Sequence, residues 1–112
     1  MSEERIFHCP VEAILSVIGG KYKCIVLYHL GHEPKLRFSE LRKLLPQATS
    51  KMLTQQLREL EADGIINREV YPVVPPKTEY SLTEYGRTLT PLMEAMCSWG
   101  KEHMADQIMA SA

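Results

Sequence analysis

The chain has 112 residues, of which 45% are hydrophobic and 24% are charged, and this composition is typical of one globular domain with its own core. Apolar runs such as Ile25-Val26-Leu27 are too short to span a bilayer, and the acidic N-terminus lacks the apolar segment of a secretion signal. The three cysteines are odd in number and widely spaced, which argues against a disulfide framework. We therefore expect a single cytoplasmic domain, residues 1–112, with no membrane partner.

The net charge of −1 hides a basic centre between two acidic flanks. Residues 21–58 carry eight Lys and Arg against two Glu, whereas the segments before and after are both net negative. A basic block of this size is typical of a phosphate-binding surface, although an uneven solvated surface gives the same count. The charge distribution thus favours a nucleic-acid partner that the average conceals.

The spacing of apolar residues and the helix-ending signals predict a definite order of elements. The expected ranges are helices 10–18, 21–30, 39–45 (capped by Ser39) and 50–63, a short strand near 36–38, strands 65–74 and 77–82, and a last helix from Thr83 to about Ile108. Gly64 is expected in a left-handed C-terminal cap, and Pro91 is expected to kink the last helix near Arg87. A helix–turn–helix followed by a two-stranded hairpin predicts a mainly α (α+β) fold, a winged helix-turn-helix, with its DNA-binding core at about 21–82.

The helix at 50–63 has two distinct faces. Three leucines, at positions 53, 57 and 60, share one face, and the opposite face carries Lys51, Thr54, Gln55 and Arg58. Each of these four can bond to phosphates or base edges, and Gln can bond adenine through two hydrogen bonds. The alternative is an ordinary amphipathic helix with a polar solvent face. The position of the helix at 50–63, directly after the turn, favours a recognition helix.

The predicted hairpin tip runs from Val73 to Lys77 and contains two prolines. Prolines have no amide donor, so Lys77 is the expected phosphate contact of the wing, unless it is only a solvated charge. The candidate DNA-binding residues are Arg37, Ser39, Thr49, Ser50, Lys51, Thr54, Gln55, Arg58 and Lys77.

The last helix carries apolar residues at alternating spacings of three and four. The predicted dimer interface consists of Leu89, Leu92, Met93, Met96 and Trp99. Such a seam can also pack on its own domain. A single winged helix reads few base pairs, however, and the helix at 10–18 also has apolar surface to spare. Both observations favour a homodimer on a palindromic double-stranded DNA operator, with 10–18 and 83–108 as dimerisation helices.

Several motifs together carry a family resemblance. They are Cys9-Pro10-Val11-Glu12, Ile18-Gly19-Gly20-Lys21-Tyr22-Lys23, Arg37-Phe38-Ser39-Glu40-Leu41, the run from Ser50 to Leu60, the run from Pro75 to Thr83, and Trp99-Gly100. In this order, over about residues 8–103, the chain resembles HxlR-type transcriptional regulators, with Tyr22 where Trp is common. The resemblance implies a dimeric, DNA-binding winged-helix protein of bacterial type. It also implies that Cys9 matches a cysteine that often senses oxidants or electrophiles.

Cys9 precedes Pro10 at the expected start of a helix, where the helix dipole favours a thiolate. Glu12, one turn further on, opposes this effect. The hypothesis is a redox-sensing Cys9, and the alternative is a capping thiol without a signalling role.

Two other functions are alternatives to a DNA-binding regulator. A metal-sensing, ArsR-like regulator would use ligands from His8, Cys9, His29 and His32, and a Cys-dependent enzyme would need a Cys–His pair. The sequence carries neither a glycine-rich phosphate loop nor a His-Glu-x-x-His or Gly-x-Ser-x-Gly motif. We therefore expect no catalytic residues, no metal site and no cofactor.

Overall fold

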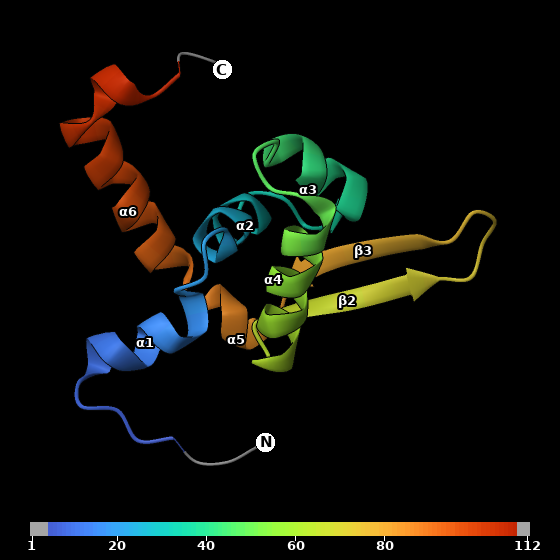
Figure 1. The fold of residues 1–112 in the computed structure, drawn as a ribbon, viewed down its shortest axis with the longest axis horizontal. Helices are drawn as coiled ribbons and strands as arrows, with labels where there is room; N and C mark the ends of the chain where they lie inside the picture. The colour runs from blue at the N-terminus through green and yellow to red at the C-terminus, as the bar shows by residue number, and fades with distance from the viewer. Residues whose placement is uncertain (1–4, 110–112) are drawn as a thin grey trace.

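The computed structural model describes residues 5–109, so Met1–Glu4 of the acidic N-terminal stretch lie outside it. The elements follow one another in the predicted order (Figure 1). They are α1 (Pro10–Ile18), α2 (Lys23–Leu30), β1 (Leu36–Arg37), α3 (Phe38–Leu44), α4 (Ser50–Ala62), β2 (Ile66–Tyr71), β3 (Lys77–Leu82), α5 (Glu84–Arg87), α6 (Thr90–His103) and a 3₁₀ turn, η1 (Ala105–Gln107). This is the predicted winged helix-turn-helix, with α3 and α4 as the helix pair and β2 and β3 as the wing.

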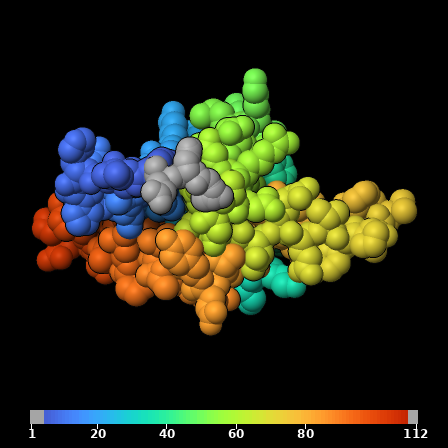
Figure 2. Space-filling view, turned by 90° about the horizontal axis from the view of Figure 1, so that it is seen from below, coloured from blue at the N-terminus to red at the C-terminus, as the bar shows by residue number. Residues whose placement is uncertain are grey.

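The sheet is antiparallel with strand order β1-β3-β2. β2 and β3 pair from Ile66–Leu82 to Tyr71–Lys77, and β1 adds only Leu36 and Arg37 to the other edge of β3. β2 ends at Tyr71, three residues before the predicted end, and residues 72–76 form the connection. The hairpin extends away from the body at one end of the molecule, while α1 and α6 lie at the opposite end (Figures 1 and 2).

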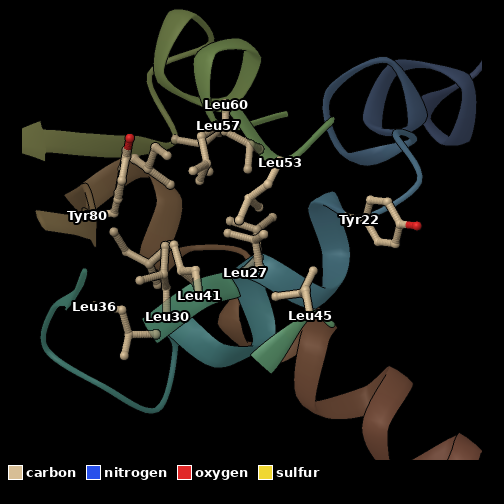
Figure 3. Packing of buried hydrophobic residues seen from close by; sticks show 14 of the residues in the cluster. Tyr22, Leu27, Leu30, Leu36, Leu41, Leu45, Leu53, Leu57, Leu60 and Tyr80 are labelled. Carbon is tan, nitrogen blue, oxygen red and sulfur yellow. The ribbon is translucent and has the colours of Figure 1, made fainter. Parts of the chain in front are cut away.

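The core lies where α2, α3 and α4 cover one face of the sheet (Figure 3). The leucines of the predicted inner face of α4, Leu53, Leu57 and Leu60, are almost completely buried there. They contact a cluster formed by the other elements: Tyr22, Val26, Leu27, Leu30, Leu36, Leu41, Leu45, Ile66, Tyr80 and Leu82. Because the inner face of α4 is fixed by this packing, its opposite face is held outward.

The caps of α3 and α4 explain where these helices begin and end. Thr49 caps α4 by accepting a hydrogen bond from the amide of Met52 (3.0 Å), and Gly64 follows the helix with a φ of 76°, the predicted left-handed cap. The prediction that Ser39 caps α3 was wrong. The cap is Arg37, whose amide donates to the Glu40 carboxylate (2.7 Å), so α3 begins at Phe38.

The predicted single helix from Thr83 to Ile108 is divided in the structure. α5 ends at Arg87, α6 begins at Thr90, and α6 ends at His103. Pro91 lies in the first turn of α6, where its missing amide donor costs nothing, so it starts a new helix instead of kinking an old one. α5 lies close against Ile65, just before β2, and this approach requires the glycine at position 86. A Cβ there would lie 2.1 Å from the Ile65 carbonyl oxygen.

Candidate nucleic-acid interface

The outward face of α4 presents the predicted polar residues. Lys51, Gln55 and Arg58 are exposed and Thr54 is half-buried, and the four line a shallow hollow together with Ser50. Thr54 and Arg58 also line a second hollow, whose far wall comes from the hairpin, through Arg68, Thr78 and Tyr80. The two hollows share residues, so α4 and the hairpin form one continuous polar surface.

Thr49 and Ser50 use their hydroxyls within the fold. Thr49 caps α4, as described above, and the Ser50 hydroxyl accepts a hydrogen bond from the Arg42 guanidinium of α3. The Nε atom of Arg42 is buried and has no partner among the described residues. These contacts fix the turn between α3 and α4, and the side chains of Arg37 and Ser39 are exposed at the start of α3.

Lys23 does not belong to the basic surface, although the sequence count placed it there. Its side chain is only 6% exposed, and its Nζ lies 2.7 Å from Glu59 Oε1 on α4. A signal for this burial exists in the sequence, because Lys23 is spaced three and seven residues from Val26 and Leu30, which face the core. The ion pair attaches α2 to α4 and neutralises an acidic side chain of the recognition helix.

Glu59 also accepts a hydrogen bond from Gln55, whose Nε2 lies 2.9 Å from Glu59 Oε2. The hydrogen bond from Lys23, followed by that from Gln55, lowers the pKa of the Glu59 carboxyl below its ordinary value. Glu59 is therefore a carboxylate at neutral pH, held between a buried ammonium and an exposed amide. Sequence analysis did not predict this chain of three residues.

Gln56, the neighbour of Gln55, points inward. Its Oε1 accepts a hydrogen bond from the backbone amide of Tyr22 (3.2 Å), and a Cβ on Gly20 would lie 2.3 Å from the same oxygen. The Tyr22 hydroxyl donates to the Gln47 carbonyl (3.2 Å) in the turn before α4. The segment between α1 and α2 thus holds the recognition helix at two points, which gives the Gly-Gly-Lys-Tyr-Lys motif a structural role.

Two lysines flank the same aromatic ring near the tip of the wing. Lys77 Nζ lies 5.4 Å and Lys35 Nζ lies 5.9 Å from the centre of the Tyr71 ring. Lys35 is also paired with Glu69 (3.6 Å) and Glu79 (3.8 Å), and a hydrogen bond to the Tyr71 hydroxyl is the largest of the effects that raise its pKa. Lys77 makes no ion pair among the described residues, so it is the more available charge.

The predicted dimer-interface residues of α6 are divided between the protein's own core and its exposed surface. Met93 is buried and Leu89 half-buried against the protein's own core, whereas Leu92, Met96 and Trp99 are 38%, 47% and 57% exposed. On α1, Val11 and Leu15 are also more than half exposed. This apolar surface is at the end of the molecule opposite the wing (Figures 1 and 2).

Cys9 occupies the predicted N-cap position of α1 and is exposed, but its side chain makes no capping hydrogen bond. The Glu12 carboxylate instead accepts a hydrogen bond from the backbone amide of His8 and contacts the Nδ1 atom of the His8 ring. The other two cysteines are half-buried, and burial raises the pKa of the Cys24 thiol. The Cys97 thiol lies 3.6 Å from the Tyr28 hydroxyl oxygen.

Of the histidines that were candidate metal ligands, His29 and His32 lie beside the Tyr28 ring, whereas His8 bonds to Glu12. His32 Nδ1 is 2.9 Å from the Tyr28 carbonyl oxygen and its Nε2 is 3.2 Å from Glu94, while burial lowers the pKa of His29. Within residues 5–109, no three or more His, Cys, Asp or Glu side chains are grouped as metal ligands would be. Nor does this part of the chain contain a helix of the length and hydropathy needed to cross a membrane.

Comparisons with known proteins agree with this architecture. Residues 17–108 match the family model of the HxlR-like helix-turn-helix. The chain is 58% identical over 102 residues to YtcD of Bacillus subtilis, described as an HTH-type transcriptional regulator, covering 91% of this chain and 80% of that protein. Among solved structures, the oxidised form of the redox regulator HypR aligns with a TM-score of 0.80 at 59% identity, over 85% of this chain and 97% of that one. The reduced form of the transcriptional regulator YodB from B. subtilis aligns with a TM-score of 0.68 at 30% identity, over 91% and 100%.

Proposed function

Because the chain belongs to the HxlR-like helix-turn-helix family, and is thus a helix-turn-helix transcriptional regulator and not an enzyme, we propose that it binds a palindromic DNA operator as a homodimer. The observation that carries this proposal is the outward face of α4, where Lys51, Thr54, Gln55 and Arg58 form a polar surface continuous with the wing. Glu59, which is hydrogen-bonded to Gln55 of this face, is neutralised by Lys23, and the acidic Glu61 lines the second hollow together with Arg58 and Arg68. The surface therefore suits the negative potential of duplex DNA.

In the proposed complex α4 enters the major groove, as the second helix of a helix-turn-helix does. Thr54 and Gln55 read base edges, and Lys51 and Arg58 bind the phosphates on either side. Lys77 of the wing binds a phosphate further along the duplex. Among the remaining candidates, Thr49 and Ser50 act through the free backbone amides at the start of α4, because their hydroxyls are already bonded.

Arg37 and Ser39, at the start of α3, complete the proposed phosphate contacts. Both side chains are exposed at the start of α3, next to α4 in the helix-turn-helix. Arg37 adds a charge that is not used in an ion pair among the described residues.

The exposed apolar faces of α1 and α6 support the homodimer. Leu92, Met96 and Trp99 on α6, with Val11 and Leu15 on α1, expose the kind of apolar surface that a subunit interface covers. A two-fold axis at this end would place two copies of α4 on successive major grooves, about 34 Å apart.

A footprint tests the proposal. The protein is incubated with DNA from upstream of its own gene, and we expect protection of two inverted half-sites about ten base pairs apart. Gln55→Ala should weaken binding to the protected site by about tenfold or more without abolishing it, whereas Lys101→Ala, an exposed change on α6, should leave the affinity unchanged. Absence of any protected site with the unaltered protein would contradict the proposal.

The resemblance to HypR, described as a redox regulator, supports a further part of the proposal, in which oxidation or alkylation of Cys9 controls DNA binding. Cys9 is exposed at the start of α1, beside the proposed dimer surface, so a modified thiol would displace the two protomers. Operator binding is measured for wild type and Cys9→Ser, before and after diamide or a quinone. Loss in wild type alone supports a sensor, and an equal loss in both, or none in either, contradicts it.

A further inference from the structure

Three side chains of α2 and α4 form one hydrogen-bonded chain that runs from the core to the exposed face of α4. Lys23 Nζ lies 2.7 Å from Glu59 Oε1, and Glu59 Oε2 lies 2.9 Å from Gln55 Nε2. Lys23 is buried and Glu59 is partly exposed, while Gln55 is fully on the surface. The buried ammonium is thus the fixed end of the chain, and the amide of Gln55 is its outer end.

The chemistry of these groups allows the Gln55 amide only one orientation. A carboxylate has no hydrogen to donate, so the group that faces Glu59 must be the amide nitrogen of Gln55. Glu59 keeps this acceptor character at neutral pH because Lys23, and then Gln55, lowers its pKa. With the nitrogen held toward Glu59, the carbonyl oxygen of Gln55 lies on the other side of the amide, away from the carboxylate.

We propose that Lys23 and Glu59 determine which bases Gln55 selects, by fixing its carbonyl oxygen toward the DNA. In the major groove adenine and cytosine present an amino group, whereas guanine and thymine present carbonyl oxygens at the equivalent positions. An outward carbonyl therefore favours adenine or cytosine and is repelled by guanine and thymine. The inference rests on the proposed DNA-binding function, and assigns Lys23 and Glu59 as positioning residues that do not touch DNA themselves.

The same chemistry predicts a reversal when Glu59 becomes an amide. In Glu59→Gln the new side chain must give its oxygen to Lys23, since an ammonium only donates. Its nitrogen then faces Gln55, which must turn its own oxygen inward to accept. Gln55 would now present its nitrogen outward, and the favoured bases would change to guanine or thymine.

The test is a selection of binding sites from a random-sequence duplex pool. Gln55→Ala identifies the position that Gln55 reads, as the one position where sequence preference disappears. At that position we expect wild type to prefer adenine or cytosine by about tenfold, and Glu59→Gln to prefer guanine or thymine. Glu84→Gln is the control, because Glu84 is exposed on α5, lines neither hollow of the proposed DNA surface and loses the same charge, and it should keep the wild-type preference.

A second measurement uses the wild-type protein and the position that Gln55→Ala identifies, so it holds even if Glu59→Gln fails to fold. The selected site is made again with the base at that position lacking its amino group, and affinity should fall about tenfold. Unchanged affinity, a wild-type preference for guanine or thymine, or a folded Glu59→Gln with wild-type preference would each overturn the inference while leaving DNA binding intact. If wild type selects no sequence at all, the proposed function fails, and the inference fails with it.

Discussion

Replacing Lys77 with Ala should flatten the salt dependence of DNA binding by an amount that follows from the charges left free on the surface. Arg37, Lys51, Arg58 and Lys77 make no ion pair within residues 5–109. These four cations become eight in a homodimer, and each phosphate neutralised contributes about −0.9 to the slope of log K against log salt. The expected slope is about −7, so affinity should fall about 10⁴-fold between 50 and 200 mM salt.

Lys77→Ala removes two cations from the dimer, so the slope should become about −5 and the loss about 10³-fold over the same range. Lys35→Ala is the matched control, since Lys35 lies over the same Tyr71 ring but is paired with Glu69 and Glu79. Its replacement should change the slope much less. Fluorescence anisotropy of a labelled operator at several salt concentrations gives both slopes. An unchanged slope in Lys77→Ala, or an equal change in both variants, would refute the assignment of Lys77 to a phosphate.

Four other changes test the fold and the dimer. Trp99→Ala removes a large exposed apolar side chain of α6 and should give a folded monomer in sedimentation, whereas an unchanged dimer would exclude Trp99 from the interface. Gly86→Ala would place a Cβ 2.1 Å from the Ile65 carbonyl oxygen, and should lower the free energy of unfolding in urea by about 1–3 kcal/mol or more. Gly100→Ala, in open space on α6, should raise this free energy by about 0.5–1 kcal/mol, and equal effects of the two changes would contradict the packing. Because the pKa of Glu59 is lowered in the folded protein, its contribution is present at neutral pH and is lost as the pH falls through its native value. Urea midpoints should therefore fall more steeply on acidification in wild type than in Glu59→Gln, and parallel curves would contradict this.

The elements that could be predicted from the sequence are those whose limits are set locally. α1 and β3 have the predicted bounds, and the leucine face of α4 is buried as its periodicity indicated. The division between α5 and α6 was not predicted, although Pro91 in the first turn of α6 is a local signal for it. The close packing of α5 was not predicted because it depends on Gly86 fitting against Ile65, far away in the chain. Periodicity and caps describe a helix in isolation, and a contact of this kind is outside their reach.

In the candidate site, the sequence likewise predicted which residues are charged but not which of them form ion pairs. The outward polar face of α4 followed from helical spacing, but counting Lys and Arg overstated the basic surface, because Lys23 and Lys35 have acidic partners elsewhere in the chain. On α6 the spacing predicted an apolar stripe, but it did not predict which residues of the stripe are buried in the protein's own core. Met93 is buried there, whereas Trp99 is exposed. Which partner a side chain finds is decided by tertiary structure.

Gln55 and Gln56 are neighbours of identical chemistry, yet they differ in their freedom to evolve. Gln56 accepts a hydrogen bond from the Tyr22 amide and lies against Gly20, so a side chain at position 20 would displace the Gln56 amide, and a change at position 56 would remove a contact between α4 and the segment before α2. Within residues 5–109, the Gln55 side chain bonds only to Glu59 on its own helix. Under the proposed function, a duplicated copy of this gene would therefore acquire a new target sequence through a single substitution at Gln55, while the attachment of α4 to the rest of the protein is inherited unchanged.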